Sequence, residues 1–155
     1  MARVAERLTE LGLELPPVAA ALAAYVPAVR TGSYVYTSGQ LPIVDGELQE
    51  TGKVGHGPGC VSPERAAELA RTCALNALAA VASQVGDLDR IRVVKVVGYV
   101  ASEPSFTGQP GVVNGASLLL GDVLGDAGVH ARSAVGVAVL PLDAPVEVEI
   151  VAEVL

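Results

Sequence analysis

Small and apolar residues recur three or four positions apart between residues 62 and 86, and this period predicts a long helix. Its apolar stripe consists of Ala66, Leu69, Ala70, Cys73, Ala77 and Ala80. Side chains this short allow a helix to lie close to a sheet. Ser62 is a favoured N-cap residue, Pro63 suits the first helical position, and Gly86 is expected to end the helix.

Weaker periodic signals predict two more helices and a set of strands. A second helix is expected over residues 112–124, ended by Gly125, and a short amphipathic helix over residues 2–12. Apolar or alternating runs between turn residues predict the strands. The expected strand segments are 28–29, 33–37, 41–44, a short one from residue 48 onwards, 91–101, 133–140 and 146–154.

The segment Ile91–Ala101 is apolar on both faces apart from Arg92 and Lys95, which is typical of a strand buried on both sides. We therefore expect an α/β fold with one mixed sheet of about six strands and the two main helices packed on one face. Hydrophobic residues make up 51% of the chain and charged residues 17%, so another subunit is expected to cover the second face. The chain is interpreted as one domain, residues 1–155, with residues 1–20 as an N-terminal helical extension.

The sequence contains neither a typical membrane span nor a typical signal peptide. The uncharged run Leu15–Val29 contains three prolines, which interrupt a helix, so it is not expected to cross a membrane. The chain begins Met1-Ala-Arg3 and reaches Glu6 without an apolar segment. We therefore expect a cytoplasmic protein.

Charge and residue types narrow the function classes further. The net charge is −7 without a basic patch, and the chain has no Trp and one Phe, so nucleic-acid binding is not expected. Cys60 and Cys73 lack metal-ligand spacing and are expected to be reduced thiols; a single disulfide in a secreted protein is the alternative. His56 and His130 have no Cys or Ser partner at recognisable spacing, so neither a metal site nor a catalytic triad is expected.

Arg132 stands at the start of an otherwise apolar predicted strand. Alternation divides this strand into a core face with Val135, Val137 and Val139, and a second face with Arg132, Ala134, Gly136 and Ala138. The small neighbours leave room beside the guanidinium, whose planar fork can bind a carboxylate through two hydrogen bonds. The alternative is a strand-end arginine in a surface ion pair.

Glu147 and Glu149 share one face of the last predicted strand, with apolar residues on the other face. Two carboxylates at this spacing are typical of a solvated face. Alternatively, one of them positions or deprotonates a water molecule. With Arg132 on a neighbouring strand, opposite charges would then meet at one cleft.

Three further positions have both a structural and a functional interpretation. Ser38-Gly39-Gln40 follows an apolar strand and offers a hydroxyl and backbone N–H groups, although Ser-Gly is also a common turn dipeptide. Asn114 lies early in the second helix, where it either caps the helix or turns its amide into a cleft. Tyr25 is either a core aromatic residue or the wall of a pocket.

In their order along the chain, these residues resemble the signature segments of the reactive-intermediate deaminase (YjgF-like) family. The resemblance covers about residues 25–153, and its closing segments are the most specific. The matching segments are Tyr25–Gly32 and Val35–Pro42, then Val94–Lys95, Tyr99–Val100 and Val113–Asn114, and finally Ala131–Ser133, Leu140–Pro141 and Val146–Glu149.

The resemblance implies a chorismate-mutase-like fold and a homotrimer with sites at the subunit interfaces. It implies hydrolysis of enamines and imines derived from amino acids to 2-keto acids and ammonia, without a cofactor. By position, Arg132 corresponds to the arginine that holds the substrate carboxylate, and Glu147, rather than Glu149, to the glutamate that activates water. The substrate-binding positions of the family correspond to Tyr25, Ser38, Gly39, Asn114, Arg132 and Ala134.

Ala134 stands where many relatives carry a cysteine, so the expected pocket lacks a thiol. The N-terminal helix and residues 50–61 also make the chain longer than the simplest members. The missing thiol leaves a second hypothesis open, in which the protein is a non-catalytic module that binds a 2-keto acid or a similar metabolite. A third hypothesis, an endoribonuclease or translation inhibitor, is disfavoured by the acidic, aromatic-poor composition and the lack of a His pair for RNA cleavage.

Overall fold

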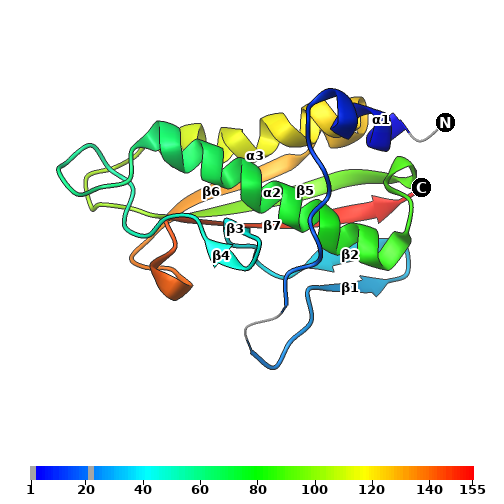
Figure 1. The fold of residues 1–155 in the computed structure, drawn as a ribbon, viewed down its shortest axis with the longest axis horizontal. Helices are drawn as coiled ribbons and strands as arrows, with labels where there is room; N and C mark the ends of the chain where they lie inside the picture. The colour runs from blue at the N-terminus through cyan, green and yellow to red at the C-terminus, as the bar shows by residue number, and fades with distance from the viewer. Residues whose placement is uncertain (1–2, 21–22) are drawn as a thin grey trace.

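The computed structural model of the protein describes residues 3–20 and 23–155. Figure 1 shows its helices, α1 (Arg3–Glu10), α2 (Pro63–Val85) and α3 (Gln109–Leu124). The strands are β1 (Ala28–Thr31), β2 (Tyr34–Thr37), β3 (Ile43–Val44), β4 (Glu47–Leu48), β5 (Ile91–Ala101), β6 (Ala131–Val137) and β7 (Val146–Val154). Short 3₁₀ turns are η1 (Leu88–Arg90), η2 (Gly125–Gly128) and η3 (Pro141–Asp143).

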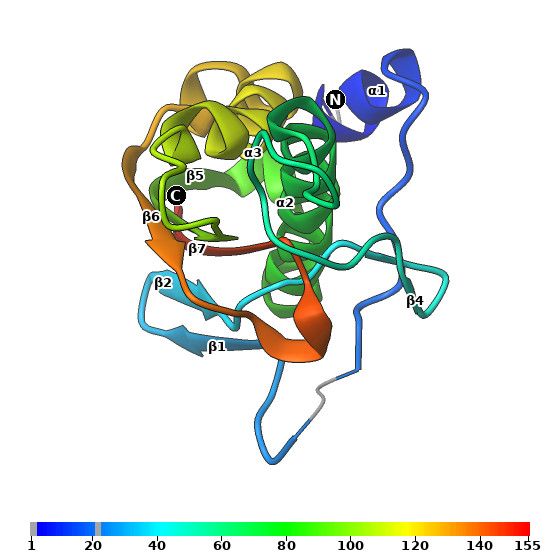
Figure 2. The same ribbon diagram turned by 90° about the vertical axis from the view of Figure 1, so that its left-hand side faces the viewer.

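The main sheet has the strand order β1-β2-β7-β5-β6. Only β5 and β6 run parallel among its neighbouring strands, because α3 connects them as a crossover. Figure 2 shows α2 and α3 as one layer above this sheet. The predicted α/β fold with helices on one face of a mixed sheet is therefore confirmed. The sheet has five strands rather than six, because β3 and β4 form a separate hairpin that turns at Asp45 and Gly46.

The long helix α2 has the predicted bounds and buried stripe. Ser62 Oγ accepts a hydrogen bond from Arg65 N–H, and Gly86 at the other end has a left-handed φ of 75°. All six small and apolar residues of the predicted stripe are buried: Ala66, Leu69, Ala70, Cys73, Ala77 and Ala80. These local capping signals therefore account for both ends of the helix.

The other two helices differ from their predicted bounds at one end each. The helix α3 begins at Gln109 rather than at residue 112, because Pro110 is tolerated in a first helical turn. The helix α1 ends at Glu10, and residue 2 of its predicted range lies outside the described residues. Within the described ranges, no helix is both long enough and apolar enough to cross a membrane.

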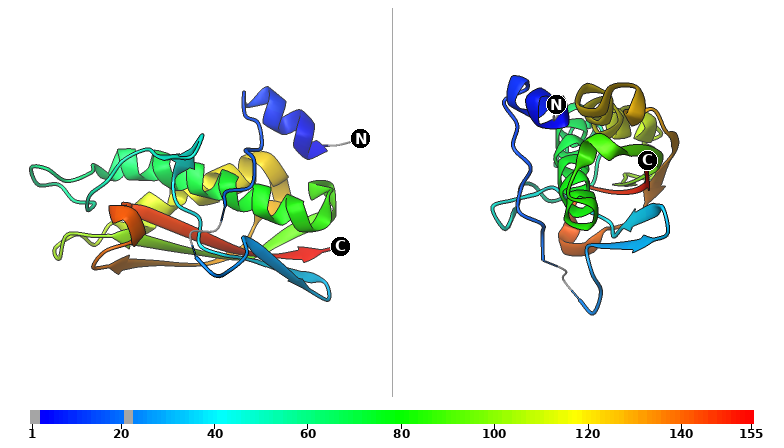
Figure 3. Two further views of the ribbon diagram at one scale, coloured as in Figure 1. Left: turned by 60° about the horizontal axis from the view of Figure 1, so that its bottom comes forward. Right: turned by 90° about the vertical axis from the view of Figure 1, so that its right-hand side faces the viewer.

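The face of the sheet opposite α2 and α3 is open in the single chain. Figure 3 shows the helices on one side of the sheet and no helix on the other. This open face carries large apolar side chains, among them Val29, Tyr36 and Val135, which are 54%, 48% and 41% exposed. The predicted bare and apolar face is therefore present.

The two faces of β6 were predicted the wrong way round. Arg132 pairs with Val96, a fully buried residue of β5 under the helices, so Arg132 and Gly136 face α3. Val135 and the expected third core residue Val139 are exposed, and β6 ends at Val137 rather than at Leu140. Alternation gives two faces, but it does not say which face the helices cover.

Candidate functional site

Glu147 lies on the open face of β7, between buried neighbours. Val146 and Val148 point to the helices and are fully buried, whereas Glu147 is half-buried. Burial raises the pKa of Glu147 above the usual value of a glutamate, and the nearby charge of Glu149 raises it further. Glu147 therefore holds a proton more firmly than an exposed carboxylate, as a general base or acid requires.

The segment 38–40 is bound to β7 beside Glu147. Gln40 N donates to Val148 O at 2.8 Å, and Val148 N donates back to Gln40 O at 3.0 Å. This pairing holds the backbone of Gly39 against the Glu147 side chain: a β-carbon built on Gly39 would overlap the carboxylate and lie 2.7 Å from its carbon atom Cδ. The absence of a side chain at residue 39 is therefore what allows Glu147 to occupy its position.

Ser38 connects the same segment to the loop that carries Tyr25. Its hydroxyl donates to Val26 O at 2.6 Å, and its backbone N–H donates to Pro27 O at 2.8 Å. The hydroxyl that was predicted to face a ligand is thus used within the chain. Among the hydrogen bonds of the described residues, none uses the backbone N–H of Gly39, which remains a donor for a ligand.

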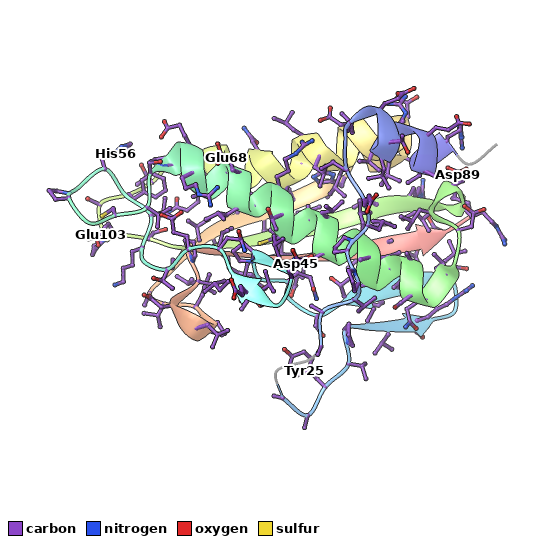
Figure 4. The ribbon with its side chains drawn as sticks, in the orientation of Figure 1. Tyr25, Asp45, His56, Glu68, Asp89 and Glu103 are labelled. Carbon is purple, nitrogen blue, oxygen red and sulfur yellow. The ribbon has the colours of Figure 1, made fainter. Side chains whose placement is uncertain are left out.

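A pocket of about 250 Å³ opens at this place. It is lined mainly by apolar residues, together with Gln40 and Glu147, and its walls include Tyr25, Pro27, Gly39, Leu41 and Pro141. Tyr25 is 47% exposed and lies on the loop before β1 (Figure 4), so it is a pocket wall and not a core aromatic residue. The pocket combines an apolar surface with one perturbed carboxylate and one free N–H group.

Asn76 supports this pocket from α2, a role that the sequence did not indicate. Its buried side chain donates to Leu41 O and to Ile43 O, each at 3.0 Å. These two bonds attach residues 41–43, which follow the segment 38–40, to the helix α2. In the sequence, the only indication of this role was that Asn76 is a single polar residue flanked by small and apolar residues in the predicted helix.

Arg132 belongs to a second polar cluster, formed with the first half of α3. Its Nη1 donates to Asn114 Oδ1 at 2.8 Å and to Ser117 Oγ at 3.2 Å, and its Nη2 donates to Pro110 O at 3.2 Å. Asn114 therefore binds the arginine instead of capping the helix, whose N-cap is Gly108. Arg132 makes no ion pair among the described residues, which removes the alternative of a surface ion pair within the chain.

Three of the five N–H groups of the Arg132 guanidinium are used in these bonds. The remaining donors are Nε–H and one Nη2–H. Two donors on adjacent nitrogens match the two oxygens of a carboxylate. Ala134 lies on the same side of β6, half-buried against the core, and adds no polar group to this cluster.

Within one chain, the Arg132 cluster and the Glu147 pocket lie apart. β5 lies between their strands, and the pairing of Arg132 with Val96 and of Glu147 with Tyr99 places them three residues out of register. At about 4.8 Å between strands and 3.3 Å per residue, the two backbones are about 14 Å apart. Their side chains also point to opposite faces, because Val96 is buried under the helices and Glu147 is on the open face. The expectation that Arg132 stands on a strand next to that of Glu147 was therefore wrong, because β5 separates β6 from β7.

Comparison with known proteins identifies relatives along nearly the whole chain. The model of the family described as "YjgF/chorismate mutase-like, putative endoribonuclease" matches residues 5–154. Protein TCP17 of Trypanosoma cruzi is 45% identical over 153 residues, which are 97% of this chain and 94% of that protein. The crystal structure of Atu1372 of Agrobacterium tumefaciens, described as a protein of unknown function, has a TM-score of 0.88 and 44% identity, and covers 97% of this chain and 92% of its own.

A more distant structure shares the fold and contains a small ligand. Escherichia coli TdcF, solved with bound serine, has a TM-score of 0.64 and 23% identity, and covers 90% of this chain and 93% of its own. The family match includes α2, α3 and every strand of the sheet. The chain belongs to the YjgF/chorismate mutase-like family.

Proposed function

We propose that the protein is an imine deaminase, which hydrolyses enamines and imines derived from amino acids to 2-keto acids and ammonia. The observation that carries the proposal is the Arg132 guanidinium, which is held by three hydrogen bonds and keeps two donors for a carboxylate. Every amino-acid-derived imine has such a carboxylate. TdcF, which shares the fold, was solved with bound serine, a small molecule that also has a carboxylate, and this supports a carboxylate-bearing ligand.

The Arg132 cluster and the Glu147 pocket together can perform each step of the hydrolysis. Arg132 binds the carboxylate of the protonated imine, and Glu147 removes a proton from water as the water oxygen bonds to the imine carbon. Glu147 then gives this proton to the nitrogen, and the C–N bond breaks while the new hydroxyl gives its proton to Glu147 and forms the keto group. Glu147 passes this last proton to the departing ammonia, which leaves as ammonium, so the carboxylate is restored. The free N–H of Gly39 is a donor for the oxygen that gains charge.

The same proposal requires more than one chain. Arg132 and Glu147 face opposite sides of one sheet, so a small substrate can contact both only where the Arg132 cluster of one chain meets the Glu147 pocket of another. The open apolar face, with exposed Val29, Tyr36 and Val135, supplies a surface for such contacts. We propose a homotrimer, and light scattering that shows a stable monomer at micromolar concentration would contradict it.

Turnover of a freshly formed imine tests the proposal. An amino-acid oxidase produces the imine in the cuvette, catalase removes the peroxide, and 2-keto acid release is followed with and without the protein. The wild type is expected to accelerate the release, and Arg132→Ala to abolish the acceleration while the fold is retained. Release no faster than the uncatalysed rate would refute the deaminase proposal.

A metabolite-binding module is the second candidate, because Ala134 leaves the Arg132 cluster without a thiol. In that case a 2-keto acid binds in calorimetry but the wild type does not accelerate imine hydrolysis. An endoribonuclease, which the description of the family suggests, finds less support. RNA cleavage by paired histidines needs two imidazoles at one phosphate, whereas His130 bonds to Ser117 and His56 contacts Phe106.

A further inference from the structure

A chain of hydrogen bonds connects Arg132 to the turn before β6. Arg132 Nη1 donates to Ser117 Oγ at 3.2 Å, and Ser117 Oγ lies 2.9 Å from His130 Nε2. His130 Nδ1 in turn lies 2.6 Å from the backbone oxygen of Gly128. The steps proposed for imine hydrolysis use neither Ser117 nor His130.

The partners determine the direction of these bonds. The Gly128 carbonyl can only accept, so His130 Nδ1 carries a hydrogen, and in the neutral ring Nε2 is an acceptor. The Ser117 hydroxyl then donates to His130, which leaves the lone pairs of its oxygen for Arg132. All donors therefore point the same way, from Arg132 through Ser117 and His130 to Gly128, and hydrogen bonds in such a chain strengthen one another.

The far end of this chain is fixed by packing. Gly128 is buried in η2, and a β-carbon built on it would lie 2.7 Å from the carbonyl carbon of Leu120 in α3. The turn is thus packed against the backbone of the helix that also carries Ser117. Both the Gly128 carbonyl and the Ser117 hydroxyl, which bond to the two nitrogens of the imidazole, are therefore held by α3.

We infer that His130, acting through Ser117, is a positioning residue that holds the Arg132 guanidinium with Nε–H and one Nη2–H available to the substrate carboxylate. The role assigned to this carboxylate rests on the proposed function. His130 lies just before β6, and both its ring and the Arg132 guanidinium reach Ser117 Oγ, while Asn114 and Ser117 are three residues apart on one face of α3. An arginine held in this way loses its rotamer freedom before the substrate arrives, which favours binding.

Two conservative variants test the inference: His130→Phe keeps a ring without nitrogen atoms, and Ser117→Ala removes only the hydroxyl. Each is expected to raise KM for the imine about tenfold and to leave kcat nearly unchanged, because the carboxylate is bound equally in ground and transition states. The Kd for 2-oxobutanoate, measured by calorimetry, is expected to rise by the same factor. Ser117→Thr, which keeps a hydroxyl, is expected to restore both values.

Matched variants control for general effects of these changes. His56→Phe alters the other histidine of the chain, on an exposed loop (Figure 4). Ser83→Ala removes a hydroxyl that donates to Ala80 O and accepts from Gln84 Nε2, both near the end of α2 and remote from the Arg132 cluster. Both variants are expected to keep wild-type KM and Kd. If His130 acts through Ser117, the double variant His130→Phe/Ser117→Ala is no weaker than either single variant. In an Arg132→Ala background, neither change is expected to have a further effect.

The outcomes separate this inference from the proposed function. Normal turnover with unchanged KM and Kd in both variants would overturn the inference and leave the deaminase intact. No turnover by the wild type, but tenfold weaker 2-oxobutanoate binding in both variants, would overturn the deaminase and support the inference. A wild type that neither turns over the imine nor binds 2-oxobutanoate would overturn both. If thermal melting shows that His130→Phe does not fold, the KM and Kd values of Ser117→Ala and Ser117→Thr decide whether the inference holds.

Discussion

Replacing Gly39 with Ala tests the Glu147 pocket with a single methyl group. The φ of Gly39 is not in the left-handed region, so alanine can adopt its backbone conformation, and the only obstacle is the Glu147 side chain. A β-carbon at residue 39 would lie 2.7 Å from Glu147 Cδ. Glu147 Oε1 would overlap the new methyl group, and ordinary contacts begin near 3.4 Å, so the carboxylate must move by at least about 0.7 Å or turn away from the segment 38–40.

The magnitude follows from that displacement. A shift of about 1 Å in a catalytic group can lower a rate by about 100-fold, so Gly39→Ala is expected to lower kcat for imine hydrolysis by about two orders of magnitude. The obstacle is the flexible end of a side chain and not the backbone, so the folding free energy is expected to change by no more than about 1 kcal/mol. The variant therefore separates activity from stability.

Gly121 supplies the matched control. It lies in α3, where a β-carbon would meet nothing within 4 Å, so Gly121→Ala is expected to keep full activity and to gain about 0.5–1 kcal/mol of stability. The assay is initial-rate imine hydrolysis together with chemical denaturation of both variants. Wild-type kcat in a folded Gly39→Ala would refute the position assigned to the Glu147 carboxylate in the reaction.

Four further results are expected. Arg132→Ala is expected to lower the rate of imine hydrolysis at low substrate concentration by about two to four orders of magnitude, because it removes two charge-assisted hydrogen bonds of about 1.5–3 kcal/mol each. Arg71→Ala is the surface control, and equal rates in the two variants would contradict the role of Arg132. Glu147→Gln is expected to slow hydrolysis more than Glu149→Gln. The charge of Glu149 raises the pKa of Glu147, so Glu149→Gln is expected to lower that pKa and to move the acid limb of the kcat/KM profile to lower pH. An unchanged acid limb would contradict the electrostatic effect of Glu149 on Glu147. Gly115→Ala would press a β-carbon onto a backbone carbonyl of α2 and is expected to cost about 1–3 kcal/mol in denaturation; an unchanged midpoint would contradict that packing.

Elements with local signals were predicted from the sequence nearly residue by residue. Ser62 and Gly86 define α2, and the strands Ile91–Ala101 and Val146–Val154 have the predicted bounds. The phase of β6 was predicted wrongly, because its alternation is symmetric: either face could cover the core, and the choice depends on where α3 packs. The position of α3 is set by tertiary contacts, so the residues of β6 alone do not indicate which face of the strand the helix covers.

The site could be predicted only in part for a related reason. Glu147 and Gly39 were named as candidate residues from the sequence, but their contact depends on the pairing of Gln40 with Val148, which joins segments more than a hundred residues apart. Ser117 and His130 were not connected, because their hydrogen bond joins a helix to a loop with no motif spacing. Hydrogen-bonded networks of this kind are set by the fold and not by neighbours in the sequence.

The Glu147 pocket and the Arg132 cluster need different electrostatic surroundings, and they lie on opposite faces of one sheet. A carboxylate that accepts a proton from water needs an elevated pKa, and Glu147 obtains it from partial burial and from Glu149. A carboxylate-binding arginine needs a fixed orientation without a competing anion, and the neutral partners on α3 provide this for Arg132. If both groups stood on one face of a single chain, they would pair with each other, which would lower the pKa of Glu147 and occupy the free donors of Arg132. Keeping them apart until chains associate preserves both properties, so in this proposal assembly is itself a requirement of the chemistry.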